Sequence, residues 1–112
     1  MRYLAVLLLA GCMTPAQMRE REVTLLYMKS QPAQAVVCMG RALENYRGDW
    51  GSTWREAGKP GHHELIVRTG GETLFVLDAA PNASGGSDVE MYSRPMLLPP
   101  IFDAAVEAMA GC

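Results

Sequence analysis

The sequence predicts an α+β domain in which an antiparallel meander of three to four strands is covered on one face by two helices. Two apolar, β-branched runs separated by a pair of glycines predict a hairpin, and a later alternating run predicts another strand. Two further segments repeat apolar residues at helical spacing. Because every element has one apolar face, we expect the helices to bury the apolar side of the sheet.

The first element is expected at Thr14-Pro15, where Thr14 can cap a helix and Pro15 suits its first position. This helix would run on through Leu26. The run at residues 23–28 is also compatible with a strand, so both assignments stay open. We therefore predict that residues 12–30 form an N-terminal linker or helix, followed by a small α+β domain at residues 31–112.

The first helix of that domain is predicted to open at Gln31-Pro32 and to end at Gly48. Its core-facing stripe has helical spacing and comprises Ala33, Val36, Val37, Gly40 and Leu43. Cys38 lies off the centre of this stripe, which places its thiol at the edge of the helix.

Strands are predicted at residues 52–56, 63–69, 72–78 and 88–94. Gly70-Gly71 joins the second and third of them, and two glycines accept the positive φ angles of a tight hairpin turn. In the last strand apolar and polar residues alternate, as in a half-buried strand.

The final helix follows Pro99-Pro100 and closes at Gly111. Its apolar positions recur at helical spacing and comprise Ile101, Phe102, Ala105, Val106 and Met109. Val106 and Val36 thus mark the two helices that would cover the sheet.

The N-terminus resembles that of a bacterial lipoprotein. A charged start, an apolar run to Leu9 and the sequence Leu9-Ala10-Gly11-Cys12 match a signal peptide that ends in a lipobox. The resemblance implies that residues 1–11 are removed and that Cys12 receives the lipid, with palmitate among its acyl chains. Met13 stands where lipoproteins of the inner membrane often carry Asp, so the resemblance favours the periplasmic face of the outer membrane.

Three cysteines are an awkward number for an oxidising compartment, because one stays unpaired. If Cys12 carries lipid, Cys38 and Cys112 are left to pair with each other. In the chain-entropy model a bond closing that loop stabilises the fold by roughly 4 kcal/mol. The alternative is a buried free thiol at Cys38 and a reactive Cys112.

The mature chain also resembles small exported lipoproteins of Gram-negative bacteria. The matching features are Cys38 in the first core helix, a Gly-Gly-Ser strand at residues 85–92 and a terminal helix that closes on Cys112. This resemblance implies the same fold and a disulfide from helix to C-terminus, and it implies no activity.

Candidate chemistry is sparse. His62-His63-Glu64 has metal-ligand residue types, but neighbouring strand residues point to opposite faces, so only His62 and Glu64 can converge. Asp78, Asp88 and Glu90 lie near one end of the sheet and could pair as carboxylates. The available serines, Ser84, Ser87 and Ser93, lack a nucleophile elbow, and the cysteines lack a Cys-x-x-Cys spacing. We predict no catalytic residue, no metal site and no cofactor.

Four aromatic residues form either a binding surface or part of the core, and the small size of the domain favours the core. They are Tyr46, Trp50, Trp54 and Tyr92. Scattered positive charges and a formal net charge of −2 argue against binding to nucleic acid.

These observations predict a non-catalytic, membrane-anchored envelope lipoprotein that binds or supports a periplasmic protein or other envelope component. The alternative is a lysozyme inhibitor. Membrane-bound lysozyme inhibitors are similar in size and in having a disulfide, and they carry a Ser-Gly-rich loop followed by an aromatic residue, as do residues 84–87 and Tyr92 here. Those inhibitors are all-β proteins, whereas this sequence predicts two helices.

Overall fold

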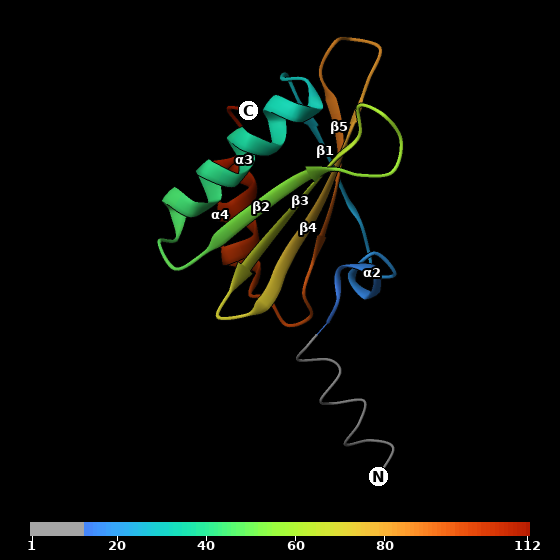
Figure 1. The fold of residues 1–112 in the computed structure, drawn as a ribbon. Coiled ribbons are helices and arrows are strands. Elements are labelled where there is room, and N and C mark those ends of the chain that lie inside the picture. The colour runs from blue at the N-terminus through green and yellow to red at the C-terminus, as the bar shows by residue number, and fades with distance from the viewer. Residues whose placement is uncertain (1–12) are drawn as a thin grey trace.

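Five antiparallel strands and three helices make up residues 13–112, the part of the chain that the computed structural model describes (Figure 1). The elements in chain order are α2 (Pro15–Met18), β1 (Thr24–Met28), α3 (Pro32–Tyr46), β2 (Gly51–Glu56), β3 (His63–Thr69), β4 (Glu72–Pro81), β5 (Ser87–Ser93) and α4 (Pro99–Ala108). The predicted signal peptide, residues 1–11, and the predicted lipidation site, Cys12, lie outside the described residues. No helix in the described part is long and apolar enough to cross a membrane.

The strands form one sheet in the order β1-β5-β4-β3-β2, with α3 and α4 packed together on one face (Figure 1). This arrangement confirms the predicted α+β class and the two covering helices. The sheet has five strands instead of three to four, because β1 adds to the meander beside β5.

Of the two assignments left open for this segment, the helix from Pro15 through Leu26 is wrong beyond its first turn, whereas the strand within residues 23–28 is confirmed. Thr14 and Gln17 form the expected capping box, but α2 ends at Met18. The chain then enters β1, in which Leu26 and Met28 face the core while Leu25 and Tyr27 are exposed. This period of two fits a strand, and the ladder with β5 fixes it.

The two faces of the sheet differ in what covers them. The helix face packs against α3 and α4 and includes the buried residues Leu65, Val67, Phe75, Leu77, Val89 and Met91. The opposite face, here called the open face, carries α2 and includes Glu64, Ile66, Val76, Asp78, Glu90 and Tyr92. Met18 anchors α2 there, because it is fully buried against Val76 and Tyr92.

The predicted turn of the central hairpin at Gly70-Gly71 is confirmed. Gly70 and Gly71 have φ angles of 55° and 85°, which a side chain would disfavour. β3 and β4 pair on either side of them, with a bulge at Val67/Arg68. β4 also runs three residues further than predicted, to Pro81.

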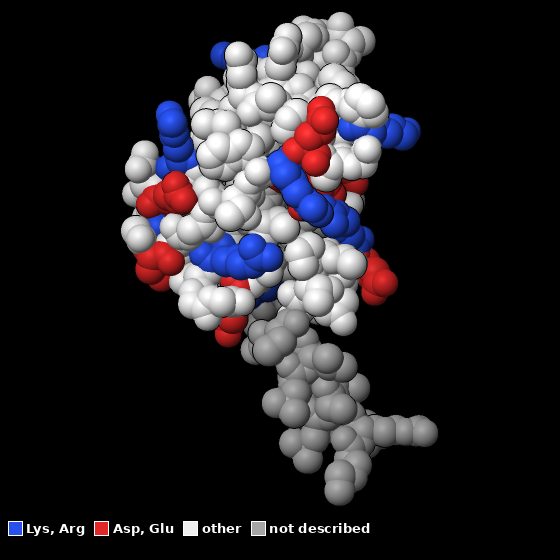
Figure 2. All heavy atoms as spheres, viewed as in Figure 1, with Lys and Arg blue, Asp and Glu red and all other residues white. Residues whose placement is uncertain are grey.

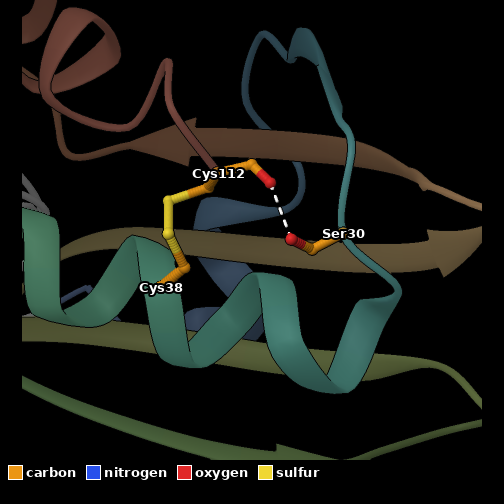
Figure 3. The surroundings of a disulfide bond; sticks show 3 residues. All are labelled: Ser30, Cys38 and Cys112. Carbon is orange, nitrogen blue, oxygen red and sulfur yellow. Dashed lines mark hydrogen bonds between the residues drawn. A yellow bond between two sulfur atoms is a disulfide. The ribbon is translucent and has the colours of Figure 1, made fainter.

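A disulfide joins Cys38 of α3 to Cys112, with a Cα–Cα distance of 5.7 Å. The helix-to-C-terminus pairing is therefore confirmed. Figure 3 shows the carbonyl of Cys112 directed at Ser30, which follows β1. This carbonyl accepts hydrogen bonds from Ser30 Oγ at 2.8 Å and from Ser30 N at 3.1 Å. The disulfide thus connects α3 to the end of β1 as well as to the segment after α4.

Candidate functional site

The main polar feature of the described residues is a charged cluster on the open face. Arg19, just after α2, donates to both carboxylate oxygens of Asp78 at 2.7 and 2.8 Å. It also donates to Glu64 Oε2, and Arg55 of β2 donates to Glu64 Oε1 at 3.0 Å. Two guanidinium groups and two carboxylates therefore neutralise one another.

Glu64 lies at the centre of this cluster and is 4% exposed. Burial alone would raise the pKa of Glu64, but the hydrogen bonds from Arg19 and Arg55 outweigh it, so its pKa lies below the usual value. The hydrogen bond to Asp78 raises the pKa of Arg19 despite partial burial, with a further contribution from Glu64. Glu64 and Arg19 are therefore both charged near neutral pH.

A cavity of about 500 Å³ opens beside the cluster, between the open face and the β2–β3 turn. The turn contributes Lys59 and His62 to its wall, and Arg55 reaches it from β2. Glu90 also lines the cavity and is exposed, but it lies outside the cluster. Arginines hold both carboxylates of the cluster, Glu64 and Asp78. The geometry therefore assigns the cluster to holding α2 against the sheet.

The histidine pair lies at the start of β3. His63 begins β3 and pairs with Glu56 and Ala79, while the next residue, Glu64, points to the open face and its arginines. His62 and Glu64 line the same cavity, and His63 lines it as well. Within residues 13–112 no group of three His, Cys, Asp or Glu side chains can hold a metal ion.

The three carboxylates near the end of the sheet are only partly brought together. Asp78 and Glu90 are direct partners across β4 and β5. Asp78 is bound by Arg19, whereas Glu90 accepts a hydrogen bond from the hydroxyl of Tyr92 at 2.8 Å. Burial and this bond raise the pKa of Tyr92 to about 12. Asp88 lies near the start of β5, where it accepts a hydrogen bond from Asn82.

The Ser-Gly-rich loop and Tyr92 do not form one exposed surface. Ser84 is exposed, but Ser87 is fully buried and its hydroxyl donates to the carbonyl of Ser30. Tyr92 is buried on the open face beneath α2. Of the residues compared with the lysozyme inhibitors, Ser87 and Tyr92 are thus engaged within the fold, whereas Ser84 is exposed.

The aromatic residues divide between core and surface. Trp50 is buried and packs edge-on against Tyr46 and Phe75, with ring centroids 5.6 Å apart in both pairs. The core assignment is confirmed for Trp50 and Tyr92. Trp54 differs, since it is about half exposed on edge strand β2.

Exposed apolar side chains gather at two other places in the described structure. Val23, Leu25 and Tyr27 lie on or next to β1, which is an edge strand with one free side. Met96 and Leu98 lie in the loop between β5 and α4. On the face drawn in Figure 2, acidic and basic side chains lie next to one another at several places, and uncharged surface lies between them. Sequence reasoning missed both apolar sites, although the alternation at residues 23–28 is a signal for the first.

Comparisons of the chain with protein-family models, curated proteins and solved structures gave no match. The function must therefore be inferred from the chain's own residues and their geometry.

Proposed function

We propose that this protein is a membrane-anchored envelope lipoprotein whose folded domain is a non-catalytic binding module. A lipid on Cys12 would hold the domain at the periplasmic face of the outer membrane. The observation that carries the proposal is the Cys38–Cys112 disulfide. It is typical of an oxidising compartment, and it accounts for two of the three cysteines, so that Cys12 is left to carry the lipid.

The binding part of the proposal is supported by a contrast between the charged cluster, which is paired within the domain, and the apolar edge strand β1, which is not. The charged cluster is neutralised internally, so its side chains serve the fold. By contrast, β1 offers a free strand edge beside the exposed side chains of Leu25 and Tyr27. Such an edge can accept an extended segment of a partner protein, which would add one more strand to the sheet.

Intact mass measurement of the full chain expressed in a Gram-negative host tests the anchor. We expect a chain that begins at Cys12 and carries lipid, with Cys38 and Cys112 alkylated only after reduction. A Cys12→Ser variant should leave the membrane fraction. An unlipidated wild-type chain, or free thiols without reduction, would contradict the proposal.

Two controls separate the anchor from the rest of the proposal. Met13→Asp should keep the lipid but shift the protein toward the inner membrane. Reproducible hydrolytic or redox turnover by the purified protein would contradict the non-catalytic part.

Inhibition of lysozyme stays a second prediction, and unchanged lysozyme activity with excess protein would reject it.

A further inference from the structure

We propose that the loop between β5 and α4 rests in the membrane interface, with Met96 and Leu98 inserted among the lipids. This inference rests on the proposed lipidation of Cys12. It names a second contact of the domain with the bilayer and thereby fixes which end of the domain faces the membrane.

The first support is the exposure of the loop's apolar side chains. Met96 is 95% exposed and Leu98 is 62% exposed, although neighbouring Leu97 packs against the core. Met96 also has a φ of 66°, and it is the sole residue other than glycine with a positive φ in the described chain. A strained backbone that holds an apolar side chain in water indicates that the side chain has a function outside the domain.

The second support is the position of the loop relative to the proposed anchor. Met13 packs against the cluster of Met18, Val76 and Tyr92 on the open face. β5 continues from Tyr92 into the loop, and at about 3.3 Å per residue Met96 lies within about 13 Å of it. In Figure 1 the blue segment leading into α2 begins just below the sheet, at the end of the strands where β5 also passes into this loop.

The third support is the short distance between the anchor and the fold. A lipid on Cys12 would be one residue, about 3.8 Å along the chain, from Met13. Since Met13 already packs on the sheet, little chain is left to act as a spacer. The end of the domain that carries Met13 must therefore lie at the bilayer surface.

The chemistry of this end fits lipid rather than a charged partner. Arg94 and Glu72, which flank the loop and the end of the hairpin, form an ion pair with each other. Pro95 and Pro99 bracket the apolar residues and restrict the loop. Insertion should therefore depend on apolar burial and change little with salt.

A fluorescent probe on the lipidated full chain tests this contact. M96C, labelled with an environment-sensitive dye, is reconstituted into vesicles of phosphatidylethanolamine and phosphatidylglycerol with brominated acyl chains. The matched control is A83C, whose exposed position lies in the β4–β5 loop at the opposite end of the strands. Intact mass must show that both labelled chains keep the lipid and the Cys38–Cys112 bond.

We expect the brominated lipids to cause roughly a twofold loss of emission from the dye at position 96 and little loss at position 83. High salt should leave this difference unchanged. Equal emission changes at both positions in a lipidated, vesicle-bound chain would overturn this inference alone. A chain without lipid that fails to bind the vesicles would overturn the proposed function as well.

Discussion

Glu64 illustrates how one buried carboxylate can hold an N-terminal segment in place. Its two oxygens accept from arginines that come from different parts of the chain. We expect Glu64→Gln to lower the free energy of unfolding by about 2–3 kcal/mol, because the partly buried guanidinium of Arg19 loses a charged partner. Denaturant titration measures this loss. The control is Glu72→Gln in the exposed Arg94 pair, where the loss should stay below about 1 kcal/mol.

The same residue predicts acid sensitivity. The pKa of Glu64 is lower in the folded protein than its usual value of 4.5, so the unfolded chain binds more protons there. The resulting stabilisation is complete above about pH 4.5 and is lost as the pH falls through the folded-state pKa. The melting temperature should therefore fall more steeply with decreasing pH below 4.5 for the wild type than for Glu64→Gln. An equal dependence of melting temperature on pH in both proteins would contradict the assignment of this acid sensitivity to Glu64.

Met96 predicts a conflict between stability and membrane contact. Asn adopts the left-handed backbone region more readily than Met, so Met96→Asn should raise the free energy of unfolding by up to about 1 kcal/mol. The same variant should weaken contact of the loop with vesicles. Thermal unfolding in detergent and quenching by brominated lipids measure the two effects. A gain of stability without any change at the membrane would contradict a lipid role for the side chain.

At the scale of elements, local signals predicted most of the secondary structure. Gly70-Gly71 between two apolar runs marked the central hairpin, and apolar spacing marked α3 and α4. The segment at residues 15–28 was ambiguous because its first turn is helical and its second half alternates. Pairing with β5 makes the second half a strand, and β5 lies far along the chain.

The charged cluster could not be predicted in the same way. Arg19 is separated from Glu64 by 45 residues and from Asp78 by 59. Its position depends on how α2 lies on the open face, which no local pattern encodes. The disulfide was predictable because counting cysteines needs no three-dimensional information.

The contact between β1 and the β4–β5 loop depends on the absence of a side chain at Gly86. A Cβ atom at this position would lie 2.3 Å from the carbonyl oxygen of Met28. Gly86→Ala should therefore destabilise the protein by about 2–3 kcal/mol, because backbone must move. Gly51→Ala, whose Cβ meets nothing within 4 Å, is the control and should be neutral or slightly stabilising. Chemical denaturation compares the two variants.

At the scale of the whole molecule, the disulfide closes a large loop. Cys38 and Cys112 are 74 positions apart, so replacing both by Ser should lower the free energy of unfolding by about 4 kcal/mol. The loss of stability should differ between strands, because Cys112 also accepts two hydrogen bonds from Ser30, next to β1. We expect amide exchange to rise more in β1 than in β3 and β4.

Ser30→Ala is the matched control for that experiment. It keeps the disulfide and the backbone bond to Cys112 but removes the hydroxyl bond, so its loss should be about 1 kcal/mol. Uniform loss of exchange protection throughout the sheet of the double variant would show that the disulfide acts only on the unfolded chain.

The position of β1 beside β5 has a consequence for the order of assembly. If the chain is exported from its N-terminus, as the proposed function implies, β1 would emerge long before its partners, because Thr24 pairs with Met91 and Ser30 bonds to Cys112. Leu25 and Leu26 would then have no strand to pair with while residues 31–93 emerge. Under the proposed export, β1 therefore cannot join the sheet until β5 has emerged, so the domain would complete its fold while already tethered to the membrane.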